Sequence, residues 1–228
     1  METTKRIGDS RPGGRTARTR SLVLGAAVEL LAEIGYDQFS IELVAERAGV
    51  HKTTVYRRWP TKVDLIADAT RERSRNHVPV PDTGTLAGDL RALARSVAAN
   101  LRSPAVHRMT SNIITASSAS PDLANGTSEF WAERLTLMRV IVERANARGE
   151  ITGSPDPNLI IEAVVGALYL RLLFTGEPID NRTADAIADL IADGATRIEE
   201  PTQPELHRLE PSRRHTPADT HPASEQLT

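Results

Sequence analysis

The 228-residue sequence predicts an all-α protein. Through most of the chain, apolar side chains recur at positions i, i+3, i+4 and i+7, which is the spacing of one helical face. Aromatic residues make up only 4% of the chain, whereas a β-sandwich would require more Val, Thr, Tyr and Phe. No two strand-like runs are joined by a hairpin turn. These three observations favour packed helices over a sheet.

The beginning of the chain is expected to hold a disordered arm and a first helix. Residues 1–17 are polar, with several glycines and basic side chains, which is typical of a disordered basic arm. An apolar stripe with helical spacing then runs over residues 21–34, and Gly35 suits the position just beyond its end.

Three more helices are expected to complete a first domain over residues 18–76. Ser40 is a natural N-cap for a short second helix, and Gly49 follows that helix in a turn. The third helix is expected over residues 52–58. The fourth runs from about 62 to 75 and links this unit to the rest of the chain.

A second domain is expected over residues 77–200, where five helical patterns are separated by Pro- and Gly-containing stretches. The tail, residues 201–228, is rich in Pro, Thr, His and Glu with little apolar content, and predicts disorder. The five expected helices cover residues 86–101, 105–117, 123–148, 158–174 and 183–199.

Composition excludes several classes of site. The chain has no cysteine, so disulfides, thiolate nucleophiles and Cys-based metal sites are impossible. No Gly-rich phosphate loop, GxSxG elbow or Ser-x-x-Lys motif occurs, so we expect neither an enzyme nor a cofactor. The longest apolar stretch, residues 159–174, contains Glu162 and Arg171 and is too short to span a bilayer comfortably. We therefore expect a cytoplasmic protein with no membrane partner.

Metal binding is also not expected. The six histidines show no paired metal-ligand spacing. Asp185, Asp189 and Asp193 recur every four residues, which places three carboxylates on one helical face. A Ca²⁺ or Mg²⁺ site would require convergent oxygens from several segments. An ordinary amphipathic helix explains the pattern better, because an apolar stripe faces the other way.

Charge is distributed unevenly along the chain. Residues 1–76 carry 14 Lys and Arg against 10 Asp and Glu, whereas the remainder carries 14 against 20. A basic N-terminal part followed by an acidic remainder indicates that the N-terminal part meets a polyanion.

Residues 40–62 combine a helix, a Gly-containing turn and a second helix. In a helix-turn-helix the second helix enters the DNA major groove. Here Val55 and Trp59, four apart, are expected to face the core, which leaves Lys52, Thr53, Tyr56 and Arg57 on the outward face. These side-chain types contact thymine methyls, guanine edges and phosphates. The alternative is the solvated polar face of a small packing helix.

The full pattern resembles the N-terminal DNA-binding domain of the tetracycline-repressor (TetR-like) family. The resemblance lies in AVELLAEIGY at 27–36, SIELVAERAGV at 40–50 and TVYRRWPTK at 54–62. It implies a phosphate-contacting role for Tyr56 and a DNA-contacting lysine at Lys62. The expected DNA-binding residues are Arg18, Ser40, His51, Lys52, Thr53, Thr54, Tyr56, Arg57, Arg58 and Lys62. Arg11, Arg15, Arg18 and Arg20 are expected to add phosphate or minor-groove contacts.

The C-terminal part also resembles one branch of these regulators, in residues 156–180, where that branch builds its dimer interface. The expected helix over 158–174 is apolar nearly all round and therefore needs partners on two sides. The interface of a homodimer is expected to include Ile161, Val164, Val165, Leu168, Leu172, Ile187 and Ile191.

An effector site is expected where aromatic and Met side chains gather in this aromatic-poor chain, because such side chains with a few polar groups line ligand sites. The alternative is that they only fill the core. The expected effector-binding residues are His107, Met109, Ile113, Phe130, Trp131, Leu135 and Met138.

The resemblance and the residues together predict a one-component transcriptional repressor. It would bind a pseudo-palindromic double-stranded DNA operator as a dimer, and a small apolar effector would release it. One alternative is a helix-turn-helix DNA-binding protein with no small-molecule response. Another is an all-α enzyme that carries a helix-turn-helix, which the missing catalytic residues disfavour.

Overall fold

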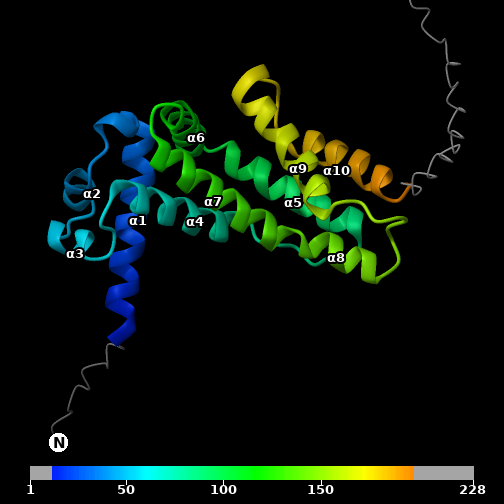
Figure 1. The fold of residues 1–228 in the computed structure, drawn as a ribbon, viewed down its shortest axis with the longest axis horizontal. Helices are drawn as coiled ribbons and strands as arrows, with labels where there is room; N and C mark the ends of the chain where they lie inside the picture. Colours follow the sequence, from blue (N-terminus) through cyan, green and yellow to red (C-terminus); the bar gives the residue numbers. More distant parts are fainter. Residues whose placement is uncertain (1–11, 198–228) are drawn as a thin grey trace, which may run out of the picture.

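The computed structural model describes residues 12–197, and every regular element in them is helical (Figure 1). The predicted all-α fold is therefore confirmed for this part of the chain. Residues 1–11 of the expected arm and the whole expected tail lie outside it. The elements are α1 Pro12–Gln38, α2 Ile41–Arg47, α3 Lys52–Tyr56, α4 Lys62–His77, α5 Leu86–Leu101, α6 Pro104–Ser117, α7 Pro121–Met138, α8 Val140–Ala147, α9 Pro157–Leu170, a π-helical turn η1 Arg171–Thr175, and α10 Asn181–Ala195.

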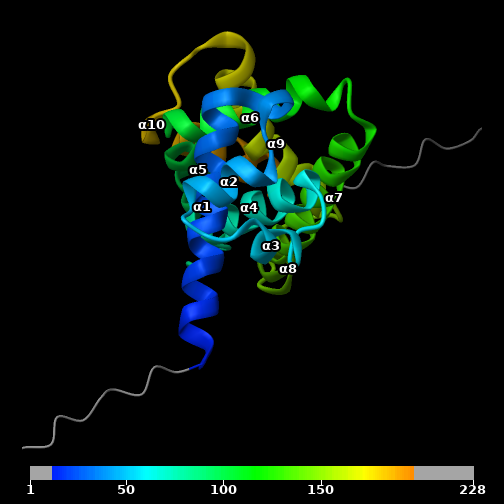
Figure 2. The same cartoon turned by 90° about the vertical axis from the view of Figure 1, so that its left-hand side faces the viewer.

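The first helix begins earlier than the sequence predicts, so the expectation of disorder is wrong for residues 12–17, which are helical. The N-terminal turns of α1 project beyond the other helices (Figure 2). Just after this extension, α1 is tied to α4, because Arg20 pairs with Asp68 at 2.6 Å and with Glu72 at 2.7 Å. Local composition could not reveal these partners, which lie about fifty residues away in the chain.

Gly35 interrupts α1 as predicted. Its φ of 74° and ψ of 178° are open to glycine and strained for other residues. The break redirects the chain so that Phe39 is buried and Ser40 can cap α2.

Two apolar cores hold the helices together. The N-terminal core consists of buried side chains of α1–α4 together with Met109, Ile113 and Leu123 of α6 and α7. The C-terminal core consists of buried side chains of α5, α8, α9 and α10 with Val78, Val106, Met138 and Ile151. Because α6 contributes to both, the first domain is not packed independently of the second.

Three of the expected C-terminal helices differ in extent from the prediction. The expected helix over 123–148 is divided at Arg139, where an i to i+3 bond from the Val142 N–H (3.0 Å) replaces the α-helical pattern. The expected helix over 158–174 changes at Arg171 into a π-helical turn, which Gly176 closes with a φ of 67°. The last helix begins at Asn181, capped by Asp180, and ends at Ala195.

Candidate nucleic-acid interface and adjoining cavity

The helix-turn-helix forms as predicted. The Ser40 hydroxyl accepts a 3.3 Å bond from the Leu43 N–H at the start of α2. Gly49, with a φ of 67°, provides the turn between α2 and α3. Val55 and Trp59 are buried, and the indole of Trp59 donates a 3.0 Å bond to Asp68. These contacts fix the face of α3 that points away from the protein.

The outward face of α3 carries the side chains that the sequence predicts there. Lys52, Thr53, Tyr56 and Arg57 are exposed, whereas Thr54 is half-buried. The helix ends at Tyr56, so both arginines that follow it lie in the adjoining turn. His51 occupies the N-cap position, but its side chain makes no capping bond. Its ring is exposed and can therefore contact DNA.

Tyr56 is positioned by a neighbouring carboxylate. Its hydroxyl donates a 2.7 Å hydrogen bond to Glu42 of α2. This bond raises the pKa of Tyr56 and lowers the pKa of Glu42. The phenol has one O–H, which Glu42 accepts here, so a bond from Tyr56 to a phosphate oxygen requires this hydrogen bond to break.

Two predicted DNA contacts are engaged inside the protein instead. The half-buried ammonium of Lys62 donates a 3.1 Å bond to the carbonyl of Tyr36 and lies 3.8 Å from the centre of its ring. Lys62 thus joins α4 to the end of α1. Arg20 is held by Asp68 and Glu72. Both side chains have partners within the protein, and their contacts with DNA stay predictions.

The remaining predicted basic contacts have different positions. Arg18 is exposed on α1, and the guanidinium of Arg58 lies 5.4 Å from the Trp59 ring centre. Arg11 and the side chain of Arg15 lie outside the described residues.

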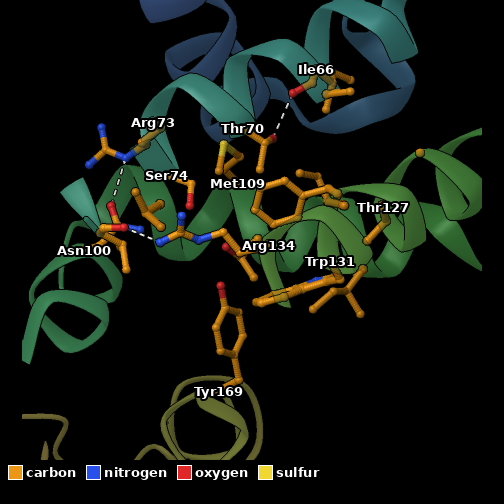
Figure 3. A pocket seen from close by; sticks show the side chains of 18 of the residues that line it. Ile66, Thr70, Arg73, Ser74, Asn100, Met109, Thr127, Trp131, Arg134 and Tyr169 are labelled. Carbon is orange, nitrogen blue, oxygen red and sulfur yellow. Dashed lines mark hydrogen bonds between the residues drawn. The ribbon is translucent and has the colours of Figure 1, made fainter. Parts of the chain in front are cut away.

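A cavity of about 140 Å³ lies between α4, α6 and α7, with α5 and α9 completing its wall (Figure 3). Five predicted effector residues line it: Met109, Ile113, Phe130, Trp131 and Met138.

Two predicted effector residues do not line this cavity. His107 is exposed, because two residues along a helix turn a side chain by about 200° from the direction of Met109. Leu135 packs against the C-terminal core. The prediction that they line the cavity is wrong in this structure.

Aromatic rings form one wall of the cavity. Trp131 makes edge contacts with Phe130 and with Tyr169 of α9, both with ring centres 5.3 Å apart. Burial raises the pKa of Tyr169 to about 12, so its hydroxyl stays protonated. That hydroxyl points toward Arg134 in Figure 3.

Polar residues that the sequence did not predict also line the cavity. Arg134 is 6% exposed and donates a hydrogen bond to the carbonyl of Val78, where α4 ends. Arg73 of α4 donates a 3.2 Å bond to Asn100 of α5. Spacing in the sequence was the one indication that Arg134 lines the cavity. Arg134 follows Trp131 by three residues and precedes Met138 by four, so the three side chains share one helical face.

Comparison with known proteins identifies the family. Residues 23–69 match the model of bacterial regulatory proteins of the tetR family, and residues 80–191 match a tetracyclin repressor-like C-terminal domain. The HTH-type transcriptional regulator AqdR of Rhodococcus erythropolis is 34% identical over 183 residues, which cover 79% of this chain and 86% of that protein. The chain belongs to the TetR family.

Further similarities agree with this assignment. The DNA-binding transcriptional repressor TetR of Mycobacteroides abscessus is 32% identical over 182 residues, covering 75% of this chain and 90% of that protein. The crystal structure of the TetR family transcription regulator SCO0332 is similar, with a TM-score of 0.66 and 31% identity, covering 78% of this chain and 98% of that one. The chain is accordingly a DNA-binding transcription regulator of the TetR family, and its relatives are regulators rather than enzymes.

The predicted dimer interface of this TetR-family chain is partly wrong. The chain's own core buries four of the predicted residues, because the inner face of α9 packs on other helices of the same chain: Ile161, Val164, Val165 and Leu168. The other three, Leu172, Ile187 and Ile191, are half-buried. The outer faces of α9, η1 and α10 instead expose Leu159, Leu170, Phe174 and Leu190.

The same apolar helix is the one segment in residues 12–197 long and apolar enough to cross a membrane. Pro157–Thr175 has 19 residues and a mean hydropathy of 1.6. Length and composition alone give this result, and a core or interface helix of a soluble protein meets the same criteria.

Two of the three regularly spaced aspartates of α10 face arginines of α5. Asp185 pairs with Arg95 at 2.6 Å, and Asp189 pairs with Arg91. In the described part of the chain, no group of three or more acidic or histidine side chains could hold a metal ion. The regular spacing of the aspartates thus coincides with ion pairs between two helices.

Proposed function

We propose that this TetR-family regulator is a cytoplasmic, ligand-responsive repressor. It binds a pseudo-palindromic operator as a homodimer, and a small, largely apolar effector releases it. The observation that carries the proposal is the cavity against α4, the helix that links the DNA-binding unit to the rest of the chain. An apolar cavity of about 150 Å³ accommodates a ring the size of benzene.

Helix α4 contacts both the cavity and the core that holds α3, the helix expected to enter the DNA major groove. Val63, Ile66 and Thr70 line the cavity from α4. Ile66 is also part of the N-terminal core, which contains Val55 of α3. An effector that moves α4 would therefore move the surface that meets DNA.

Helix α6 also connects the cavity to the N-terminal core. Met109 and Ile113 line the cavity and are themselves buried in the N-terminal core. Ligand binding would favour one arrangement of these helices over another, which is a population shift.

Dimerisation is supported by the exposed apolar side chains near the C-terminal end of the described chain. Phe174 is 78% exposed and Leu190 is 73% exposed, although both side chains are strongly apolar. A second copy related by a two-fold axis would cover this surface, and binding in successive major grooves requires its α3 to lie about 34–36 Å from the first, one helical turn of DNA. A dimer interface also accounts for the apolar character of α9, without a bilayer.

The test combines a screen with a DNA-binding measurement. An operator is selected from random double-stranded DNA, and small apolar compounds are screened for a rise in melting temperature. Fluorescence anisotropy then measures operator affinity with and without each stabilising compound. A coupling of about 1–3 kcal/mol predicts 5–150-fold weaker operator binding at saturation.

Trp131→Ala provides the matched variant. It is expected to bind the operator as the wild type does and to lose the response to the compound, because Trp131 lines the cavity far from the outward face of α3. A compound shown by crystallography to occupy the cavity without changing operator affinity would contradict the proposed function.

A further inference from the structure

The cavity contains a buried cation without a counter-ion. Arg134 is 6% exposed, and its one hydrogen bond in the described chain goes to the neutral carbonyl of Val78. A guanidinium has five N–H donors, so most of its donors have no protein acceptor. No Asp or Glu lines the cavity.

We propose that the effector of this cavity is an apolar molecule with one anionic group, such as a carboxylate, and that Arg134 binds this group. The inference rests on the proposed function, because it names the chemical class of the proposed effector.

The acidic residue next to Arg134 in sequence is already paired elsewhere. Glu133 accepts two hydrogen bonds from Arg71, at 2.7 and 3.1 Å, on the outer side of α4 and α7. This pairing leaves the charge of Arg134 uncompensated.

A second arginine lies at the edge of the cavity, and in Figure 3 its guanidinium is directed away from Arg134 and the aromatic rings. Arg73 lines it from α4, and its hydrogen-bond partner, the Asn100 amide oxygen, is neutral. Burial lowers the pKa of both Arg73 and Arg134. Arginine nevertheless stays charged in proteins, so both remain cations. A cationic ligand would meet like charge here.

An uncompensated buried charge is unfavourable, and an anion bound beside it recovers part of that free energy. A carboxylate also matches the planar fork of a guanidinium with two parallel hydrogen bonds. The protonated hydroxyl of Tyr169, which points toward Arg134, offers another donor (Figure 3). Arg134 and Tyr169 thus place two donors near each other at this end of the cavity.

The rest of the cavity suits an apolar body. Met109, Ile113, Phe130 and Trp131 line it and offer no acidic group. An effector with its anionic group at Arg134 would lay its hydrocarbon part along these side chains.

The test compares head groups on two constant apolar bodies. Isothermal titration calorimetry of the full-length protein at pH 7.5 uses 3-phenylpropionate, 3-phenylpropan-1-ol and 3-phenylpropan-1-amine, and then octanoate, octan-1-ol and octylamine. A hydrogen bond to a charged group predicts that each carboxylate binds at least about 10-fold more tightly than its alcohol. Each amine is expected to bind most weakly.

Arg134→Met removes the charge and keeps an apolar side chain of similar length. It is expected to abolish the preference for carboxylate over alcohol and to retain alcohol binding. Arg139→Met is the control, because Arg139 lies at the end of the same helix, does not line the cavity and pairs with Glu143. It should leave the preference unchanged. The comparison on the wild-type protein stands even if Arg134→Met does not fold.

Equal or tighter binding of the alcohols or amines would overturn the inference. If such neutral or cationic compounds also weaken operator binding, the proposed function stands and only the anionic class is wrong. If none of the six compounds binds, the inference is contradicted, and the operator-release screen separately decides the proposed function.

Discussion

The side-chain amide of Asn112 donates a 2.7 Å hydrogen bond to the backbone carbonyl of Leu31. Asn112 lies on α6, which lines the cavity, and Leu31 lies on α1, at the centre of the N-terminal core. Arg108 makes a parallel contact one turn earlier, from its Nε to the carbonyl of Ala32 at 3.3 Å. These bonds connect the cavity to the DNA-binding unit.

Asn112→Ala should weaken this connection. Loss of one partly buried hydrogen bond is expected to lower the free energy of unfolding by about 1 kcal/mol. The effector should also weaken operator binding by a smaller factor than in the wild type, because a movement of α6 is then no longer transmitted to α1 through this bond. Thr115→Ala, at an exposed position of the same helix, is the control for both chemical denaturation and anisotropy. An undiminished factor in Asn112→Ala would show that coupling does not pass through this bond.

Arg57 and Lys62 should behave differently when replaced. Arg57→Ala is expected to change affinity for particular bases by about 1–3 kcal/mol if the guanidinium reads a base edge. Lys62→Met should instead lower thermal stability, because it removes the bond to Tyr36 and the contact with its ring.

Anisotropy on a panel of single-base operator variants measures the first effect, and thermal unfolding measures the second. Lys52→Met is the matched control for Lys62→Met, since Lys52 is exposed and its loss should leave stability unchanged. Equal thermal stability of Lys62→Met and Lys52→Met would contradict the internal role of Lys62.

Phe174→Arg and Leu190→Arg should disrupt the proposed dimer, because each places a charge on the exposed apolar surface of η1 and α10. Both variants should remain folded. Sedimentation velocity at micromolar concentration should show monomers, and operator affinity should fall together with dimerisation.

Leu137→Arg is the control, because Leu137 is 52% exposed on α7, away from that surface. It should sediment as the wild type does. A wild-type protein that is monomeric at this concentration would refute the dimer. Val165→Arg is unsuitable as a test, since Val165 is 6% exposed and the variant should unfold.

The contact between α5 and α10 should make stability depend on pH in the acid range. The hydrogen bond from Arg95 lowers the pKa of Asp185 below that of an unfolded aspartate, about 3.9. A carboxylate with a lowered folded-state pKa contributes stability above the unfolded value, and this contribution is lost as pH falls through the folded value.

Asp185→Asn should therefore flatten the fall in unfolding free energy between pH 5 and pH 3. Urea titrations at each pH measure the slope. Asp193→Asn, at an exposed aspartate of the same helix for which the structure gives no ion pair, should keep the wild-type slope. Identical slopes for all three proteins would contradict this role of Asp185.

Helical spacing and capping residues act locally, so the sequence was sufficient to predict where most helices lie and which face of α3 points outward. It did not predict the division at Arg139 or the π-helical turn from Arg171. It also did not predict the helical turns over residues 12–17, or that Arg20, which follows them, pairs with Asp68 and Glu72 of α4. Nor could it decide which side of α9 is buried, since both sides are apolar and only the packing of α5 and α10 distinguishes them.

Among the cavity residues, the sequence predicted apolar and aromatic side chains but not the polar ones, because burial of a polar side chain depends on how the helices pack. Met109 and Trp131 are conspicuous by residue type. Arg134 is a charged residue of the kind usually found on a surface, and its burial becomes evident only when α4, α7 and α9 are placed together.

In the proposed mechanism, an effector in the cavity changes the separation of the two DNA-binding units in a dimer. Because the chain has no cysteine, Glu46→Cys on the exposed side of α2 provides one spin label per protomer. Double electron–electron resonance then reports one distance between protomers. We predict a narrow distribution in the operator complex and a clearly shifted one when a cavity-binding compound is added at saturation. The same distribution with and without bound compound, or no dipolar signal at all, would contradict this mechanism.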